Sequence, residues 1–278
     1  MSPTTTAAAR TRRGHASAVA ALDEYESFCE GLRQLSGVDL TQYRRPQMER
    51  RLRTYFTRKG IASLPDALPG LATDRHKLDE LLDRVTINVS QLWRHPTQIE
   101  HLRSKLLPEL ASAGRVRIWS AGSSYGAEAF TLAAECQATI PTTPVTIVGT
   151  DIDRRIVERA RLGCFTTEDA RDVPEAVMRA GFERTRDGWR ARPALRAMVS
   201  FEVGDLLRMS PRSASYDLIV CRNTVIYFSE PVRDDLHGRL SRALRIGGYL
   251  LVGATERVAK PAELGLAPTT PFFYRRDR

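Results

Sequence analysis

The fold is decided by residues 116–135, VRIWSAGSSYGAEAFTLAAE. The first six residues form a short apolar run that predicts a buried strand, and the residues after Gly126 have the apolar spacing of a helix. Between them, Gly122 and Gly126 allow the backbone to approach a ligand closely, and the amides at the helix start favour an anionic group. The glycine spacing is neither that of a dinucleotide-binding turn nor that of a P-loop. The turn alone is therefore equally compatible with a purely structural role.

From residue 116 onward, short apolar runs alternate with helical stretches, which predicts a doubly wound α/β domain with a parallel sheet. The expected strands are 116–121, 145–150, 198–203, 216–221 and 249–253, with a last one near 272–275. The segment FERTRDGWRAR, residues 182–192, predicts a small inserted hairpin that turns at Asp187-Gly188.

The chain before residue 116 has a different composition. Residues 1–18 are rich in Ser, Thr, Ala and Arg and lack hydrophobic periodicity, which predicts a disordered tail. Apolar residues then recur at helical spacing, so we expect a small all-helical domain over 19–85. Residues 86–110 are expected to be a linker with a helix. The α/β domain is expected over 111–278, with its β insertion at about 180–194.

The bulk composition excludes several classes of protein. No stretch reaches the roughly 20 apolar residues that span a bilayer, and the first twenty residues lack the apolar centre of a secretory signal. The four cysteines are far apart and form no CxxC pair, so we expect neither a metal site nor a disulfide framework. We therefore expect a cytoplasmic protein, monomeric and without direct membrane insertion.

The formal net charge of +9 is compatible with nucleic acid, an anionic membrane surface or an acidic protein as partner. Arginine dominates the basic residues, and a GC-rich genome explains that bias equally well. The sequence holds no RNA- or DNA-recognition motif, so we expect no nucleic-acid partner.

Polar residues follow four of the expected strands. Asp151 ends the second strand, 25 residues after Gly126, where doubly wound folds place an acid that accepts hydrogen bonds from a ribose diol. Asp205 follows the third strand, and Cys221-Arg222-Asn223 follows the fourth. All of them fall on the carboxyl edge of the sheet, where open α/β folds bind ligands. Taken singly, Asp205 is as compatible with a turn or a helix cap.

Several motifs resemble those of the CheR family of chemotaxis receptor methyltransferases in order and spacing, over roughly residues 20–278. The motifs are TINVSQLWR (86–94), AGSSYGAEAF (121–130), GTDIDRRIVERARLGCF (149–165), VGDLL (203–207) and CRNTVIYF (221–228). The arginine-rich stretches YRR (43–45) and ERRL (49–52) are also similar to the family's N-terminal helical domain. The resemblance implies a class I, Rossmann-like methyltransferase domain preceded by a small all-helical domain.

The resemblance also implies an activity. The protein would transfer a methyl group from S-adenosylmethionine to glutamate side chains on the cytoplasmic coiled coil of a chemoreceptor, giving glutamate methyl esters and S-adenosylhomocysteine. Matching positions imply these cofactor contacts: Asn88, Ser90, Arg94, Glu128, Asp151, Asp205, Leu206, Cys221 and Arg222. Gly122 and Asn223 are added as candidates on the same edge. Arg94 and Tyr227 would lie nearest the methyl group.

The chain also departs from the family pattern. The departures are Leu92-Trp93 for a Phe pair, Ser123 for Cys, Tyr125 for Thr, Ala127 for an acid, Ala129 for Pro and Asp205 for the more usual Asn. We expect the bulk of Tyr125 to crowd the methionine end of the cofactor. The inserted hairpin is short, which favours recognition that does not depend on a receptor's C-terminal tail.

The implied chemistry requires no general base, because a glutamate side chain is already ionised at pH 7. We hypothesise that Arg94 orients the cofactor and the incoming carboxylate, and that the Tyr227 hydroxyl fixes the transfer geometry. The alternatives are a surface arginine and a core tyrosine with a satisfied hydroxyl. Glu128 would pair with the amino group of the cofactor, and its alternative role is interaction with the helix dipole.

Four arginines are candidates for binding the receptor. Arg44, Arg51 and Arg58 are seven residues apart on one helix and share a face, with Arg50 and Arg53 beside them. This face suits an acidic receptor helix, and a solvated basic face is the alternative. Two other functions stay open: a methyltransferase for a signalling protein outside chemotaxis, and a catalytically silent binding module.

Overall fold

The computed structural model describes residues 13–86 and 90–278, with side chains described from Glu24 onward except at Thr86. The chain divides into two compact units, residues 1–86 and 87–278. Residues 1–12 of the expected tail lie outside the described residues, and helix α1 begins at Arg13, before the end expected for that tail.

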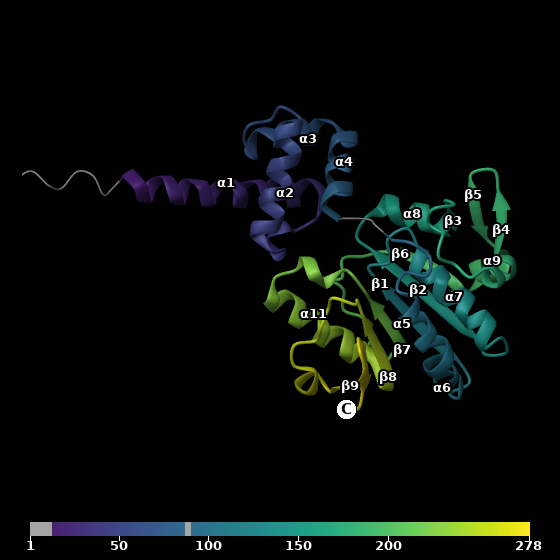
Figure 1. The fold of residues 1–278 in the computed structure, drawn as a ribbon. Coiled ribbons are helices and arrows are strands. Elements are labelled where there is room, and N and C mark those ends of the chain that lie inside the picture. The colour runs from purple at the N-terminus through teal and green to yellow at the C-terminus, as the bar shows by residue number, and fades with distance from the viewer. Residues whose placement is uncertain (1–12, 87–89) are drawn as a thin grey trace, which may run out of the picture. The chain divides into compact units, whose positions relative to one another are not determined.

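The first unit is helical (Figure 1). Its core contains Phe28, Leu32, Leu52, Phe56 and Leu81, each at most 3% exposed, and the rings of Phe28 and Phe56 meet edge to face at 5.6 Å. The elements are α1 (Arg13–Ser36), η1 (Leu40–Gln42), α2 (Arg45–Arg58), η2 (Pro65–Ala67), α3 (Leu68–Thr73) and α4 (Arg75–Thr86). The helical period read from the sequence therefore marks the buried face of this unit.

The second unit is an α/β domain. Its helices are α5 (Pro96–His101), the π-helical turn η3 (Leu102–Leu106), α6 (Leu107–Ala111), α7 (Ala127–Thr139), α8 (Arg154–Leu162), α9 (Glu175–Gly181), α10 (Pro193–Met198), η4 (Val225–Tyr227), α11 (Glu230–Ala243) and η5 (Pro261–Leu264). Its strands are β1 (Val116–Ala121), β2 (Val145–Asp151), β3 (Cys164–Phe165), β4 (Phe182–Thr185), β5 (Gly188–Ala191), β6 (Val199–Val203), β7 (Tyr216–Cys221), β8 (Leu244–Val252), β9 (Leu266–Thr270) and β10 (Phe273–Arg276).

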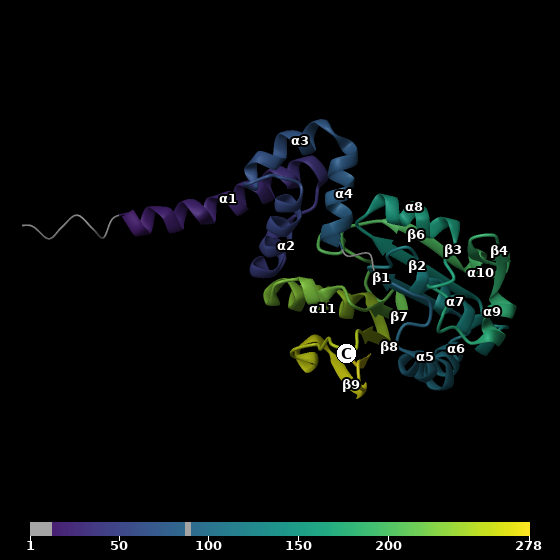
Figure 2. The same ribbon diagram turned by 45° about the horizontal axis from the view of Figure 1, so that its top comes forward.

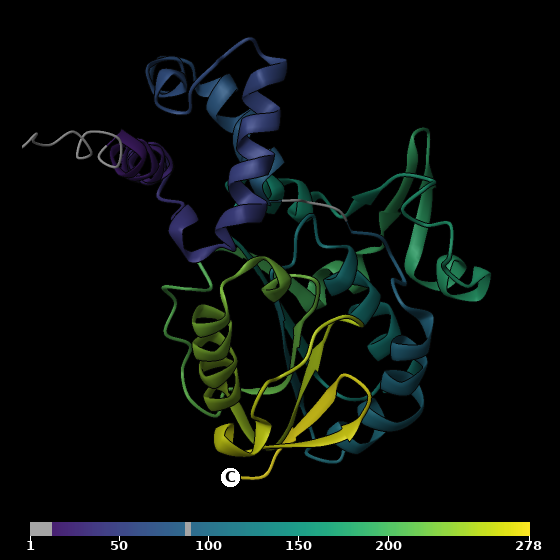
Figure 3. The ribbon, with the colours of Figure 1, turned by 60° about the vertical axis from the view of Figure 1, so that its left-hand side comes forward.

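Seven strands form the main sheet in the order β6-β2-β1-β7-β8-β10-β9. The first five are parallel, and β10 and β9 add to the edge antiparallel. Figure 2 and Figure 3 show α11 on one face of this sheet and α5, α6 and α7 on the other. The chain winds outward from β1 through β2 to β6 and then returns to the opposite side of β1 with β7. A topological switch point therefore lies between β1 and β7.

The fold class predicted from the sequence is confirmed, and the differences are local. Strand β8 begins at Leu244, five residues before the predicted start. The prediction started too late because Gly247, which has φ +79°, interrupts the apolar run of the sequence. Strand β9 was not predicted, because its sequence LAPTT (266–270) contains a proline and does not alternate apolar and polar residues. The predicted hairpin is β4 and β5, and it gains a third strand, since β3 pairs with β5.

None of the helices in 13–86 and 90–278 combines the length and apolar character required to cross a bilayer. In the same residues, no group of three or more His, Cys, Asp or Glu side chains is arranged to hold a metal ion. The four cysteines are unpaired, and three of them are buried.

Candidate active site

The loops after β1 and β7 meet at the switch point. Gly122 directly follows β1 with φ +79°, and a Cβ atom there would lie 2.4 Å from Oγ1 of Thr224 in the loop after β7. Only glycine fits both the backbone conformation and this close approach. Gly126, at φ +88°, then precedes α7. The sequence prediction of a strand, a glycine turn and a helix start thus corresponds to a close contact between two loops.

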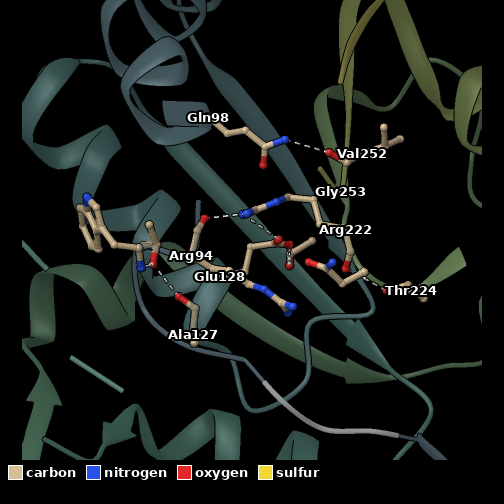
Figure 4. Close-up of polar contacts among 12 residues, drawn as sticks. Arg94, Gln98, Ala127, Glu128, Arg222, Thr224, Val252 and Gly253 are labelled. Carbon is tan, nitrogen blue, oxygen red and sulfur yellow. Dashed lines mark hydrogen bonds and ion pairs between the residues drawn. The ribbon is translucent and has the colours of Figure 1, made fainter. Parts of the chain in front are cut away.

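Glu128 and Arg222 form a buried ion pair at the centre of this edge (Figure 4). Oε2 of Glu128 lies 3.5 Å from Nη1 of Arg222, and Oε1 accepts a 2.7 Å hydrogen bond from the Ser120 hydroxyl. The side chains of Arg222 and Glu128 are 3% and 14% exposed. Burial raises the pKa of Glu128 even though Arg222 opposes the shift, and burial lowers the pKa of Arg222. A second cation beside Glu128 would therefore favour its ionised form.

The same arginine holds the segment that contains Arg94. Nη2 of Arg222 donates a 2.6 Å hydrogen bond to the backbone carbonyl of Arg94 (Figure 4). The neighbouring amide of Trp93 donates to the Thr131 hydroxyl of α7 at 3.2 Å. Trp93 and His95 both have positive φ angles, 57° and 61°, which are uncommon for residues other than glycine. The backbone on both sides of Arg94 is therefore fixed against α7 and the β7 loop, and the Arg94 side chain is half-buried.

Asp151 ends β2 and is 8% exposed. Its Oδ2 accepts the amide of Ser124 in the glycine turn at 2.9 Å, and its Oδ1 accepts the amide of Asp153 at 3.1 Å. Burial raises the pKa of Asp151. Asp153 has a different role, because its carboxylate caps α8 through the amides of Arg155 and Ile156.

The residues after β6 and at the end of β7 also reach this edge. Asp205 accepts the amide of Leu207 at 2.8 Å and lies 3.4 Å from the guanidinium of Arg208, so it closes its own turn. Leu206 is 7% exposed. Cys221 is fully buried, which raises the pKa of its thiol well above the ordinary value, so this residue packs rather than reacts.

Sequence reasoning missed Glu256. This carboxylate is 3% exposed and accepts backbone amides of Asn223 at 2.9 Å, Val225 at 3.1 Å and Gly253 at 2.6 Å. It thereby ties the β7 loop, where Asn223 has φ +58°, to the end of β8. Its position three residues after the fifth predicted strand was the available signal, since only four strand ends had been considered.

Tyr227 lies on η4, two residues after Val225, whose amide Glu256 accepts. Its side chain is half-buried. The Tyr125 hydroxyl donates to the Asp169 carboxylate at 2.9 Å and contacts the carbonyl of Ser90. Tyr125 is 4% exposed. Its hydroxyl is thus engaged by protein groups on the segment before Arg94 and on the turn after β3.

The remaining predicted site residues lie elsewhere. Asn88 is outside the described residues. The four candidate arginines belong to the helical unit. Arg53 pairs with Glu49 at 2.8 Å and with Glu24 at 3.7 Å, and Arg51 donates to the carbonyl of Val85. Arg44 and Arg58 are exposed.

The edge has unused hydrogen-bonding capacity. Among the buried side-chain atoms of the described residues that have no hydrogen-bond partner, four lie on the loops of this edge: Oγ of Ser123, Oγ of Ser124, Nε of Arg222 and Oδ1 of Asn223. Buried polar atoms are usually paired, so such a cluster indicates a ligand with both donors and acceptors. Together with the carboxylates of Glu128 and Asp151, this set fits the amino group, carboxylate and hydroxyls of S-adenosylmethionine.

Comparison with protein families supports this assignment. Residues 23–86 match the all-alpha domain of CheR methyltransferases, and residues 88–272 match the S-adenosylmethionine-binding domain of the same family. The two matches together cover most of both compact units, and they confirm the resemblance, the fold class and the methyl donor predicted from the motifs.

Individual relatives agree. The chain is 32% identical over 253 residues to a chemotaxis protein methyltransferase of Listeria innocua, a match that covers 90% of this chain and 96% of that protein. It is 31% identical over 249 residues to chemotaxis protein methyltransferase 1 of Pseudomonas aeruginosa, covering 85% of this chain and 91% of the relative. The chain therefore belongs to the CheR methyltransferase family, and it is an S-adenosylmethionine-dependent protein-glutamate O-methyltransferase.

Proposed function

We propose that the protein methylates glutamate side chains on the cytoplasmic coiled coil of a chemoreceptor, for adaptation of a chemosensory pathway. The products are glutamate methyl esters and S-adenosylhomocysteine. The observation that carries the proposal is the buried pair of Glu128 and Arg222 at the switch point, which holds the backbone of Arg94. The family match over both units and the relatives named as chemotaxis methyltransferases support it.

The residues on the carboxyl edge are assigned to the methyl donor, which supplies an electrophilic methyl group on a sulfonium. Glu128 holds its amino group, because a cation there offsets the burial that raises the pKa of this carboxylate. Asp151 accepts hydrogen bonds from its ribose hydroxyls. The other proposed contacts are Asn88, Ser90, Arg94, Gly122, Asp205, Leu206, Cys221, Arg222 and Asn223.

The protein's own contribution to the reaction is mainly positioning. The substrate carboxylate is ionised at pH 7, so no side chain has to remove a proton. Alignment of two reacting groups contributes up to about 7–11 kcal/mol to lowering a barrier. Arg94 orients the incoming carboxylate from a backbone fixed by Arg222, and the Tyr227 hydroxyl fixes the transfer geometry from a turn fixed by Glu256.

The role of Tyr227 has a direct test. Tyr227→Phe removes only the hydroxyl, so kcat should fall about 10- to 100-fold while the affinity for S-adenosylhomocysteine stays within about twofold. Steady-state kinetics and titration calorimetry measure the two quantities. Unchanged turnover would remove Tyr227 from the transfer step, and equal loss of affinity would make it a cofactor contact instead.

The exposed face of α2 is the proposed receptor surface. Arg50, Thr54 and Arg58 form a ridge that lines two grooves of the helical unit. Arg51 and Arg84 line the second groove. The ridge includes Arg50, which the sequence placed beside the arginine stripe. An acidic helix laid along it would meet several guanidinium groups, which bind carboxylates well.

Recognition is proposed to be independent of a receptor tail, because only two residues, Arg186 and Asp187, connect β4 and β5. This compact loop offers little backbone for binding a peptide strand.

The enzyme would work in the cytoplasm, where the receptor's coiled coil lies, and as a monomer.

The test uses the full chain, S-adenosylmethionine labelled in its methyl group, and membranes with chemoreceptors of the same organism. Label on a receptor band that alkali releases as volatile methanol is the expected result, since methyl esters hydrolyse in base. Membranes without receptors are the control. Absence of label despite calorimetric binding of S-adenosylhomocysteine would indicate a different protein substrate. Absence of binding as well would favour a catalytically silent module.

A further inference from the structure

A second polar cluster lies behind the glycine turn. The Tyr125 hydroxyl donates to Oδ1 of Asp169 at 2.9 Å and contacts the carbonyl of Ser90. The Arg159 guanidinium stacks over the Tyr125 ring at 4.1 Å from its centroid. The ring is packed 6.4 Å from that of Phe165. Burial and Asp169 raise the pKa of Tyr125, so its hydroxyl remains a donor at working pH.

Asp169 connects this tyrosine to the segment before Arg94. Its backbone carbonyl accepts the amide of Leu92 at 3.0 Å, and its Oδ2 accepts the amide of Thr166 at 2.9 Å. The Gln91 side chain adds a 2.9 Å bond to Asp172 on the same turn. Segment 90–92 is therefore held by the turn after β3, and the tyrosine hydroxyl bridges that turn to the start of the segment.

The other end of the segment is held by the active-site pair, because Arg222 donates to the carbonyl of Arg94 and pairs with Glu128. Tyr125 directly precedes Gly126, the residue before α7, and Glu128 lies in the first turn of this helix. One end of segment 90–94 thus contacts Tyr125, and the other end is held by Arg222, the partner of Glu128. Ser90 and Arg94, the two proposed site residues of the segment, lie at its ends.

We propose that Tyr125 is a positioning residue: its hydroxyl, with Asp169, sets the distance between segment 90–94 and the glycine turn. The inference rests on the proposed roles of Ser90 and Arg94 at the cofactor. It requires no contact between Tyr125 and either reactant.

The test compares two tyrosine hydroxyls with matched partners. Tyr125→Phe removes the bridge, whereas Tyr249→Phe removes a hydroxyl that donates to the Glu109 carboxylate at 3.0 Å, near the start of β8's pairing with β7 and away from the carboxyl edge. Both side chains are at most 5% exposed. The readouts are the dissociation constant for S-adenosylhomocysteine, kcat on receptor membranes and the thermal midpoint of unfolding.

Tyr125→Phe should weaken S-adenosylhomocysteine binding about fivefold and lower kcat about tenfold, since small displacements of positioned groups have large kinetic effects. Tyr249→Phe should change neither by more than about twofold, even with a similar loss of thermal stability. Equal effects of the two variants on binding would overturn the proposal. Binding of S-adenosylhomocysteine does not depend on the receptor, so this readout tests the inference even if the proposed substrate is wrong.

A double-mutant cycle guards against a merely structural effect. Asp169→Asn alone should weaken S-adenosylhomocysteine binding severalfold, and in the Tyr125→Phe background it should add less than about twofold, because the two groups act through one hydrogen bond. Fully additive losses would show that the residues act separately and would also overturn the proposal. The Asp169→Asn variant serves as the second probe if Tyr125→Phe does not fold.

Discussion

The carboxyl edge of the sheet and the arginine ridge of α2 both depend on arginine, but the arginine is buried at the edge and exposed on the ridge. At the edge, the guanidinium of Arg222 is 3% exposed and has a carboxylate and a backbone carbonyl as partners. On the ridge, Arg50 and Arg58 are exposed to solvent. The first arrangement holds the guanidinium in one geometry, and the second leaves guanidinium groups accessible to solvent.

The difference predicts different energetics. Breaking a buried ion pair leaves a charge without compensation and is destabilising by about 3–5 kcal/mol. An exposed charge contributes about 0–1 kcal/mol, and salt screens it. Mutations at the edge should therefore change stability and cofactor affinity together, whereas mutations on the ridge should change only receptor binding.

The largest effect is expected for Arg222→Leu. It leaves the buried Glu128 without its cation and releases the carbonyl of Arg94, so the free energy of unfolding should fall by about 3–5 kcal/mol and S-adenosylhomocysteine binding should become undetectable. Urea denaturation and calorimetry measure both. The control is Arg179→Leu, which breaks an exposed pair with Glu175 and should cost at most about 0.5 kcal/mol. Similar losses for the two variants would erase the contrast between buried and exposed charges.

A smaller effect is expected at the end of β2. Asp151→Asn keeps the shape of the side chain but removes a charged acceptor, so affinity for S-adenosylhomocysteine should fall by about 1.5–3 kcal/mol, or about 10- to 150-fold. Asp153→Asn is the matched control, because Asn caps a helix as well as Asp does. Its affinity should stay within about twofold of the wild type. A drop at Asp153 as large as that at Asp151 would refute the assignment of the ribose site.

The parts of this edge that the sequence predicted are those set by local pattern. The run from Val116, the glycines of the turn and Asp151 follow from strand periodicity and from the rule that parallel strands end together. Glu256 and the partners of Tyr125 did not follow, because they depend on which loops pack together. Tyr125 and Asp169 are 44 residues apart in sequence, and only the three-dimensional path of the chain brings them together.

The ridge also shows what sequence spacing leaves open. A seven-residue spacing correctly put Arg51 and Arg58 on one side of a helix, but it did not reveal that Arg53 is held by Glu49 and Glu24. Charge patterns identify a face, whereas intramolecular pairing depends on packing between helices. The residues that remain accessible for a partner therefore have to be taken from the structure.

A still smaller effect is expected on the ridge. Arg50→Ala with Arg58→Ala should raise the apparent KM for receptor membranes about threefold to tenfold at low salt and leave S-adenosylhomocysteine affinity unchanged. The increase should shrink as salt is added, because screening already weakens these charges in the wild type. Arg53→Ala is the comparison, and its engaged guanidinium should matter less. Loss of cofactor affinity in the double variant would show that the ridge is not a separate receptor surface.

The smallest effect is a pH dependence that belongs to the edge alone. Burial raises the pKa of Glu128 in the folded chain, so between the unfolded and the folded pKa the folded state holds a proton that the unfolded state has released. The contribution of Glu128 to the free energy of unfolding therefore decreases as pH rises from the unfolded to the folded pKa. Binding of the cofactor's amino group has the opposite sign, because a cation favours the ionised carboxylate.

Affinity for S-adenosylhomocysteine should accordingly rise with pH up to the folded pKa of Glu128 and stay flat above it, by at most about tenfold per pH unit. Glu128→Gln should bind more weakly at neutral pH and lose this part of the slope. The pKa of Asp151 is also raised, so it adds a second pH dependence to the affinity for S-adenosylhomocysteine, which Asp151→Asn should remove. The ridge variants Arg50→Ala and Arg58→Ala leave both buried carboxylates in place, so they should keep the wild-type profile. Calorimetry between about pH 5 and 8 measures the affinity for S-adenosylhomocysteine in each variant. It separates the carboxyl edge from the ridge, because only the edge has buried carboxylates whose protonation changes this affinity.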